Sequence, residues 1–172
     1  MKVFIDSCIV DRLLGLGEPP RGNDTWEEDR EYLKKLLHGP VRSGEMSFLY
    51  NPTVLSQIDA IPDSKKEKRS ALLSKLQEFK FIEYNVTIFP FRFPGTFPSE
   101  EEGREIAELC RNFPKLVRDK KVLADAACSR QVDVLLTADR DLERMVQFRD
   151  LPIMCPKRLW EYFETTQRPE SR

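Results

Sequence analysis

The chain has 172 residues, of which 40% are hydrophobic and 33% are charged, a composition typical of one globular domain over residues 1–172. Its 28 Lys and Arg residues nearly balance 29 Asp and Glu residues, so the net charge of −1 excludes a whole-molecule field that attracts nucleic acid or membrane. No apolar run reaches the roughly 18 residues of a membrane span, and Asp6 comes too early for a secretion signal. We therefore expect a cytoplasmic protein with no membrane partner.

The cysteines and the histidine limit the chemistry that the chain can perform. The cysteines lack a C-x-x-C pair and a neighbouring histidine, which argues against a zinc site and favours reduced, partly buried thiols. His38 lies in LLHGP, a pattern typical of a helix C-terminus, and we favour that structural role over a catalytic one. An enzyme with this sequence would depend on carboxylates and a metal ion that they bind.

The first half of the chain predicts strands and helices in alternation. KVFID is a buried strand that ends in an acid, and a capping box of Thr25 and Glu28 opens a helix that ends at His38-Gly39-Pro40. MSFLY is the next strand, and a short helix over VLSQIDAI follows Asn51-Pro52-Thr53. KKEKRSALLSKLQEFK has helical apolar spacing, so its charges indicate a solvated helix face rather than a nucleic-acid patch. FIEYNVTIF alternates and predicts the third strand.

The second half continues the alternation after a proline-rich loop, PFRFPGTFP. Its aromatic rings could stack on bases, although packing over apolar surface is the favoured interpretation. A capping box of Ser99 and Glu102 opens a helix through EIAELCRNF, and another helix covers VLADAACSRQ. Strands at VDVLLT and PIMC, a short helix from Leu142 and a terminal helix over RLWEYF complete an α/β pattern. The alternation predicts a mainly parallel sheet of about five strands with right-handed crossovers.

Acidic residues follow two of the predicted strands. Asp6 follows KVFI, while Asp139 and Asp141 follow VDVLLT, and open parallel sheets bind ligands at the carboxyl ends of their strands. Asp119 and Asp125 flank the start of the helix that leads into VDVLLT, with Asp119 as a candidate N-cap. These acids define the candidate site.

Carboxylates gathered in one cleft repel each other unless a cation neutralises them. Hard oxygen ligands suit Mg²⁺ or Mn²⁺, which can activate water against a phosphodiester without a histidine. The alternative is that each acid caps a helix or begins a turn, which is the favoured interpretation for Asp119 and Asp141 taken singly. Taken together at strand ends, the acids favour a metal site.

Three segments of the sequence resemble the PIN domain family. VFIDSCIV is similar to its first strand, DKKVLADAACSRQVDVLLTADRDL to a helix and strand that carry spaced acids, and IMCPKRLWEYF to its last strand and helix. The resemblance spans nearly the whole chain, and the second segment is the more specific. It implies a three-layer α/β/α fold and a small metal-dependent ribonuclease.

The resemblance also implies roles for individual residues. It assigns catalysis and metal binding to Asp6, Asp119, Asp125 and Asp139, with Asp141 as a supplementary ligand. Ser7 and Thr137 become hydroxyls that orient the acids. Family members usually carry a glutamate on the helix after the second strand, where this chain has Gln57, with Asp59 nearby. This departure leaves metal affinity and activity open.

The leading hypothesis is an endoribonuclease that hydrolyses RNA at the carboxylate cluster with Mg²⁺ or Mn²⁺. Basic residues near the acids would position the RNA strand: Arg111, Lys115, Arg118, Lys120, Lys121 and Arg140. The alternative is a degenerate PIN module that binds RNA or a protein partner without cleavage, which Gln57 favours. An aspartyl phosphatase is disfavoured, because Cys8 stands where its second acid would be. The resemblance further suggests a toxin with an antitoxin partner, and a homodimer.

Overall fold

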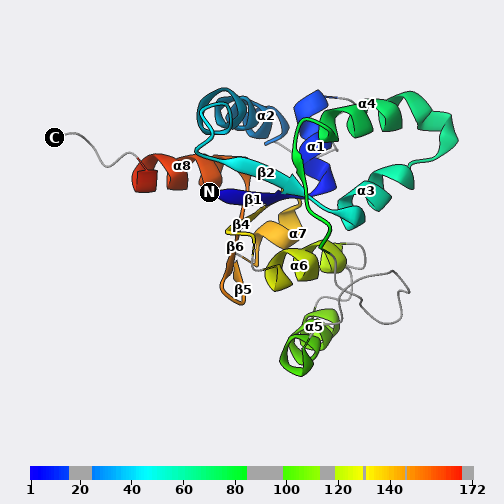
Figure 1. Cartoon of the computed structure of the whole chain (residues 1–172), viewed down its shortest axis with the longest axis vertical. Coiled ribbons are helices and arrows are strands. Elements are labelled where there is room, and N and C mark those ends of the chain that lie inside the picture. Colours follow the sequence, from blue (N-terminus) through cyan, green and yellow to red (C-terminus); the bar gives the residue numbers. More distant parts are fainter. Residues whose placement is uncertain (16–24, 85–98, 113–118, 130, 146, 168–172) are drawn as a thin grey trace.

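The computed structural model describes residues 1–15, 25–84, 99–112, 119–129, 131–145 and 147–167 of the chain. One sheet in the order β3-β2-β1-β4-β6-β5 crosses the molecule (Figure 1). Its strands are β1 (Lys2–Ile5), β2 (Ser47–Tyr50), β3 (Lys80–Phe81), β4 (Val134–Leu136), β5 (Gln147–Phe148) and β6 (Leu151–Met154). Neighbouring strands are parallel except β5, which pairs antiparallel with β6.

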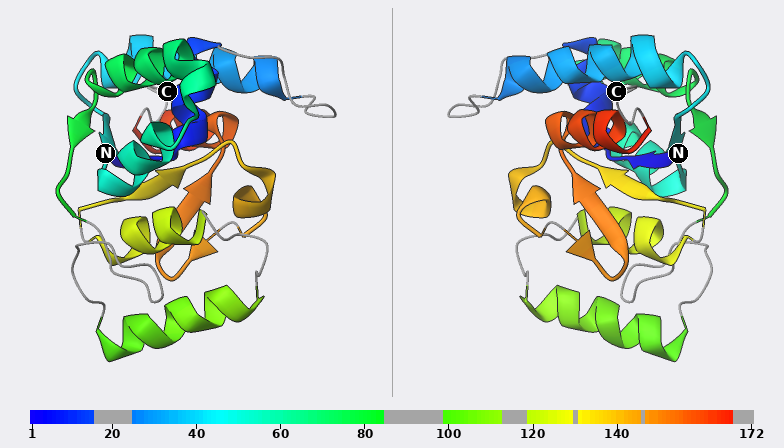
Figure 2. Two further views of the ribbon diagram at one scale, coloured as in Figure 1. Left: turned by 90° about the vertical axis from the view of Figure 1, so that its right-hand side faces the viewer. Right: turned by 90° about the vertical axis from the view of Figure 1, so that its left-hand side faces the viewer.

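Helices cover both faces of the sheet. Figure 2 shows α1, α2 and α4 along one side and α6, with α5 beyond it, along the other. The helices are α1 (Ser7–Leu14), α2 (Trp26–Leu36), α3 (Pro52–Asp59), α4 (Lys66–Leu76), α5 (Glu100–Asn112), α6 (Asp119–Cys128), α7 (Arg140–Glu143) and α8 (Pro156–Gln167). These layers confirm the predicted three-layer α/β/α fold with a mainly parallel sheet.

The centre of the sheet is built from the predicted apolar runs. Phe4 of β1 lies opposite Leu49 of β2 and Leu135 of β4, and all three side chains are buried. A parallel strand between two others is covered by helices on both faces, so an unbroken apolar run is stable there. The core therefore holds the three strand ends that precede Asp6, Asn51 and Thr137 close together.

The structure differs from the predicted elements at α1, β3 and β5. Helix α1 was not predicted, because its apolar residues Ile9 and Val10 continue the apolar run of β1 with only a short polar break. Among the described residues the third strand is Lys80–Phe81, which begins one residue before FIEYNVTIF, and Ile82 beyond it still donates to the Tyr50 carbonyl; residues 85–89 of that segment lie outside the described residues. Strand β5 was not predicted either, because two residues are too few to show a periodic pattern. Its strand conformation depends on the hairpin that it forms with β6.

The ends of α2 also differ from the predicted caps. Thr25 makes no side-chain cap, because its hydroxyl accepts a hydrogen bond from the Arg140 guanidinium, and Glu28 pairs with Lys157. At the other end the helix does not stop before Pro40, but passes into a π-helical turn (η1, Leu37–Val41) that contains it. A wider turn tolerates the missing N–H of proline better than a regular α-helix does.

Several sequence predictions fall on residues that the structure leaves out. The PFRFPGTFP loop lies outside the described residues, as does the side chain of Glu102 in the second predicted capping box. Cys8 and Cys155 are free thiols, as predicted, and Cys128 is buried, while the Cys110 side chain is not described. Among the described helices, none combines the length and apolar character needed to cross a membrane.

Candidate functional site

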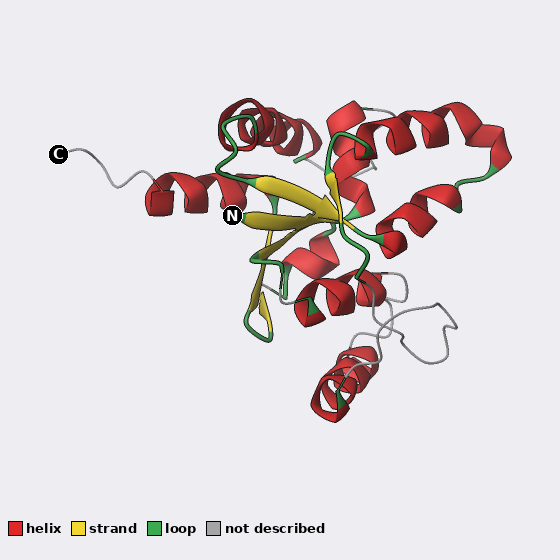
Figure 3. Cartoon of the chain, in the orientation of Figure 1, coloured by secondary structure: helices red, strands yellow, loops and turns green. Residues whose placement is uncertain are grey.

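Three neighbouring strands end at one edge of the sheet and bring polar residues there. Asp6 follows β1, Asn51 follows β2 and Thr137 follows β4. The strands are parallel and β1 lies between the other two, so Asp6 lies about one strand spacing, ~5 Å, from Asn51 on one side and from Thr137 on the other. Figure 3 shows β1 and β2 ending beside the first turns of α1 and α3. This edge is the candidate site.

Asp6 is a buried carboxylate held by neutral donors. Its side chain accepts hydrogen bonds from the Thr137 hydroxyl at 3.0 Å, the Cys8 thiol at 3.1 Å and the Ser7 hydroxyl at 3.4 Å. Only 3% of the residue is exposed. Burial raises the pKa of Asp6, the hydrogen bonds from Cys8 and Thr137 oppose that shift, and the charge of Asp139 adds to it.

Backbone N–H groups at the start of α7 hold the Asp139 side chain in position. Its side chain caps the helix by accepting from the backbone N–H groups of Asp141 at 2.8 Å and Leu142 at 3.1 Å. Its own backbone N–H donates to the Thr137 hydroxyl at 3.0 Å. Thr137 therefore connects the two acids: it donates to Asp6 and accepts from the backbone of Asp139.

Asp125 lies in the middle of α6, and its partners come from the end of β2, from α3 and from α6 itself. The carboxylate accepts from the Asn51 amide at 2.8 Å and from the Thr53 hydroxyl. Lys121, one helical turn earlier, places its ammonium 3.2 and 3.4 Å from the two carboxylate oxygens. Asp125 has no exposed surface. The structure thus ties α6 to the junction of β2 and α3 through this carboxylate.

The two remaining predicted acids, Asp119 and Asp141, lie at the start of α6 and on the surface of α7. Asp119 is the first residue of α6, six residues before Asp125, a separation that sets the two positions about 120° apart around an ideal helix. Its side chain is not described. Asp141 is exposed and pairs with Arg144 at 3.3 Å, so its described partner lies on the surface.

Gln57 occupies α3, one turn beyond Thr53. Its Oε1 atom is buried and has no hydrogen-bond partner among the described residues, while Asp59 is exposed. A buried carbonyl oxygen without a donor is unfavourable, and a cation or a bound water would satisfy it. This orphaned oxygen stands on the helix where the resemblance expects a glutamate.

These residues fit a divalent cation only in part. Within the described parts of the chain, no three acidic, cysteine or histidine side chains gather closely enough to hold a metal ion. Asp6 and Asp139 still make a pair, and Mg²⁺ is commonly held by one or two carboxylates with water in its other positions. Asp6 receives only neutral donors from the described residues, so a cation would relieve its charge.

The basic residues expected to contact RNA are not equally available. Lys121 is 8% exposed and ion-paired with Asp125, which leaves little of its side chain accessible to an RNA phosphate. Arg140 is half-exposed and bonds to Glu143 and Thr25. Arg111 is exposed on α5. Lys115 and Arg118 lie outside the described residues, and the side chain of Lys120 is not described.

Sequence reasoning missed Cys8, Asn51 and Thr53 as members of this edge. Asn51 follows a strand directly, so the strand-end rule that selected Asp6 would have found it. The spacing of four residues between Lys121 and Asp125 also indicates an ion pair on one helix face. The contacts of Thr53 and Cys8 depend on packing between distant segments, which no local pattern shows.

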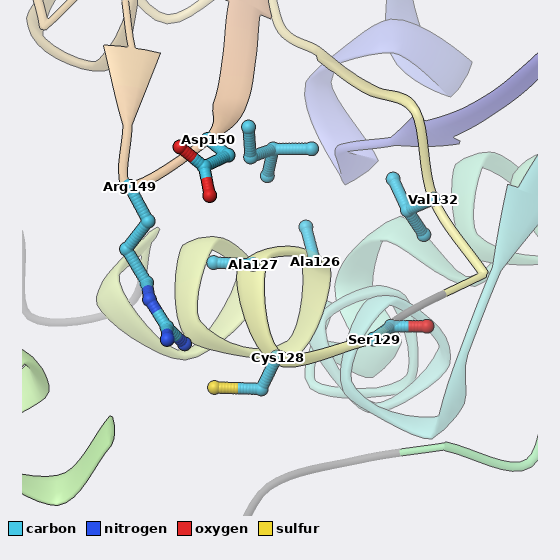
Figure 4. Close-up of a pocket in the computed structure, with 8 residues that line it drawn as sticks. Ala126, Ala127, Cys128, Ser129, Val132, Arg149 and Asp150 are labelled. Carbon is cyan, nitrogen blue, oxygen red and sulfur yellow. The ribbon is translucent and has the colours of Figure 1, made fainter. Parts of the chain in front are cut away.

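A separate pocket opens between the end of α6 and the β5–β6 hairpin. Figure 4 shows Ala126 and Ala127 facing it from the helix, with Arg149 and Asp150 approaching from the hairpin. None of the predicted acids lines it. The pocket is therefore distinct from the candidate site.

Comparison with known proteins gives a likeness of fold. No protein-family model and no curated protein matches the chain. Seven solved chains do match, among them one in the crystal structure of VapBC2 from Rickettsia felis bound to a DNA fragment from their promoter. The TM-score is 0.54 and the identity 12%, over 90% of this chain and 98% of that chain. At this identity the likeness concerns the fold alone: the chain shares the α/β architecture of that VapBC2 chain over nearly all of its length.

Proposed function

We propose that the protein is a metal-dependent endoribonuclease of the PIN type, with Mg²⁺ or Mn²⁺ held at the carboxyl edge of the sheet. Asp6 and Asp139 are the central ligands in this proposal, and Asp119, Asp125 and Asp141 are the further acids assigned to the site. The observation that carries it is the Asp6–Thr137–Asp139 arrangement, in which two acids from neighbouring strand ends share one orienting hydroxyl. The fold of the VapBC2 chain supports it.

The chain's own residues would prepare this site for a cation. The bound ion would polarise a phosphodiester oxygen and activate water for attack. Thr137 and Cys8 hold the Asp6 carboxylate in one orientation, and the α7 cap does the same for Asp139. Burial of Asp6 keeps competing water away from one side of the site. Arg140, directly after Asp139 and with a half-exposed side chain, is the basic residue that we assign to an RNA phosphate.

The same proposal includes partners for the protein. RNA is the proposed substrate, and the VapBC2 likeness together with the sequence resemblance supports a protein partner of the antitoxin kind. A homodimer also belongs to this proposal. Binding experiments with the purified chain test each of these partners.

A cleavage assay tests the proposed activity. Protein stripped of metal with EDTA is incubated with mixed RNA while Mn²⁺ or Mg²⁺ is added back, and products are separated by size. We expect cleavage that depends on the metal and is lost in Asp6→Asn and Asp139→Asn. Asp150→Asn, which changes an exposed acid on the hairpin, serves as the matched control. Cleavage that persists in EDTA, or in both site variants, would contradict the proposal.

The second candidate is a PIN-like module that binds RNA or a protein without cleavage. The Lys121–Asp125 ion pair favours it, because one of the assigned acids is already neutralised, and Gln57 supplies no charge. Fluorescence anisotropy with labelled RNA separates the two candidates. Binding without metal-dependent products would support the module.

A further inference from the structure

Helix α2 begins without a side-chain cap. Thr25 occupies the N-cap position, but its side chain makes no cap hydrogen bond and instead accepts from the Arg140 guanidinium. The first N–H groups of an α-helix have no partner within the helix, so the start of α2 presents donors that Thr25 does not cap, at the positive end of the helix dipole. Phosphate groups commonly bind at helix starts of this kind.

A buried arginine lies against this first turn. The guanidinium carbon of Arg12, on α1, is 3.7 Å from the centre of the Trp26 ring, and Trp26 is the first residue of α2. The Arg12 side chain is 7% exposed, and its Nε atom has no hydrogen-bond partner among the described residues. The Asp29 carboxylate lies 3.7 Å from Nε, which is too long for a hydrogen bond. Arg12 therefore keeps a buried donor that an oxyanion would satisfy.

Arg140 reaches the same turn from α7. Its guanidinium donates to Thr25 and to Glu143, and 48% of its side chain is exposed. Burial raises the pKa of Asp29, and the charges of Arg12 and Arg140 both oppose that rise, so both guanidinium groups lie near this residue of the first turn. The start of α2 thus has one cation in the interior and another that opens to solvent.

The acidic residues of the first turn do not leave it with an unpaired negative charge. Two of them form ion pairs at the surface: Glu27 with Arg30 at 3.3 Å and Glu28 with Lys157 at 3.0 Å. Asp29 is buried and lies near Arg12 without a hydrogen bond to Nε. Asp29 would therefore compete with an incoming anion for Arg12, and removal of its charge would favour the anion.

We propose that the start of α2, together with Arg12 and Arg140, is a binding site for a phosphate group. Guanidinium groups bind phosphate oxygens through paired N–H donors, and the helix N–H groups add further donors. Because Arg140 follows Asp139 directly, an RNA strand at the candidate site is one source of the phosphate, and free phosphate is the other. Binding here requires neither a metal ion nor cleavage, so the inference does not rest on the proposed function.

A titration with inorganic phosphate tests the site. The isotope-labelled chain is titrated in EDTA at constant pH and ionic strength, and its amide and arginine Nε–H resonances are followed by NMR. We expect the amides of Trp26, Glu27 and Glu28 and the Nε–H signal of Arg12 to shift with one common dissociation constant. Resonances unchanged at tens of millimolar phosphate, or shifts confined to other surfaces, would overturn the inference.

Substitutions identify the groups that bind the phosphate. Arg140→Gln removes a half-exposed cation and should weaken binding at least fivefold. Its matched control Arg104→Gln removes an exposed cation on α5 and should stay within twofold of the parent. Asp29→Asn should tighten binding at least threefold, because Arg12 loses the competing carboxylate. Equal affinity of the two arginine variants, or unchanged or weaker binding in Asp29→Asn, would contradict the site.

A short RNA oligonucleotide separates the two sources of phosphate. RNA that displaces inorganic phosphate from the α2 amides would assign the site to the RNA strand, and RNA that binds without displacement would assign it to free phosphate. A chain that binds phosphate at α2 but cleaves no RNA would retain this inference and contradict the proposed function. Metal-dependent cleavage without phosphate binding at α2 would do the reverse.

Discussion

The hydroxyl of Thr137 donates a hydrogen bond to Oδ2 of Asp6 across 3.0 Å, although 131 residues separate them in the sequence. The contact joins the ends of β1 and β4, the two strands at the centre of the sheet. Because the same hydroxyl accepts from the backbone of Asp139, its loss would disturb both acids. Thr137 is thus the residue that makes a single site from two strand ends.

Replacement of Thr137 tests this connection. Thr137→Val removes the hydroxyl at nearly constant volume and leaves a buried carboxylate short of a donor, which should lower the free energy of unfolding by about 1–3 kcal/mol. Thr137→Ser keeps the hydroxyl and should retain most of the stability. Urea unfolding without metal measures both. Equal stability of the valine variant and the parent would mean that the hydrogen bond does not hold Asp6.

Asp139 combines a capping role with the proposed metal role, and two substitutions separate them. Asn caps helices as well as Asp, so Asp139→Asn should preserve stability, while Asp139→Ala should cost about 1 kcal/mol. Both variants should lose stabilisation by Mn²⁺, because each removes the carboxylate charge. Thermal unfolding with and without Mn²⁺ gives the comparison. If the asparagine variant kept the full Mn²⁺ effect, Asp139 would be only a cap.

Substitution of Gln57 tests whether the missing glutamate charge on α3 weakens metal binding. Its Oε1 is buried and has no hydrogen-bond partner within the described parts of the chain, and it lies on the helix where the family resemblance expects a glutamate. Gln57→Glu should tighten Mn²⁺ binding by at least threefold, because it adds a charged oxygen at the same side-chain length. Gln57→Leu, similar in size and without an oxygen, is the control and should not tighten binding. Equal affinity in the glutamate variant and the parent would show that Gln57 lies outside the metal site.

The raised pKa of Asp29 should make the free energy of unfolding depend on pH. It is 5% exposed, lies 3.7 Å from the Arg12 guanidinium, and burial raises its pKa to about 6 in spite of that arginine. A carboxyl with a raised pKa binds its proton more readily in the folded state, so acidification from pH 7 to pH 5 should stabilise the fold through this group. Urea unfolding should show a larger gain for the parent than for Asp29→Asn. Parallel pH profiles would refute this assignment.

The central strands could be predicted from the sequence, because β1 and β4 are apolar runs that end in polar residues. The rule for strand ends then located Asp6 and Asp139 at one edge, where the structure also places them. Local patterns did not separate α1 from β1, since the apolar residues run on across the boundary. The two-residue strand β5 gave no pattern at all, because it exists only through its pairing with β6.

The charge state of the site was harder to predict than its location. The count of acids indicated a repulsive cluster, but Lys121 neutralises Asp125 within the same helix. Spacing in the sequence shows that such a pair is allowed, yet burial decides whether it forms, and burial follows from the packing of α6 against α3. The partners Asn51 and Thr53 come from that packing as well.

Anomalous scattering from crystals grown with Mn²⁺ tests the central claim most directly, because it locates the metal without assuming an activity. We predict a manganese peak within about 2.5 Å of carboxylate oxygens of both Asp6 and Asp139, with Lys121 still paired to Asp125. Asp6→Asn crystals grown under the same conditions should lack that peak. A data set with no manganese at this edge, or with manganese bound only elsewhere, would show that Asp6 and Asp139 do not form the metal site.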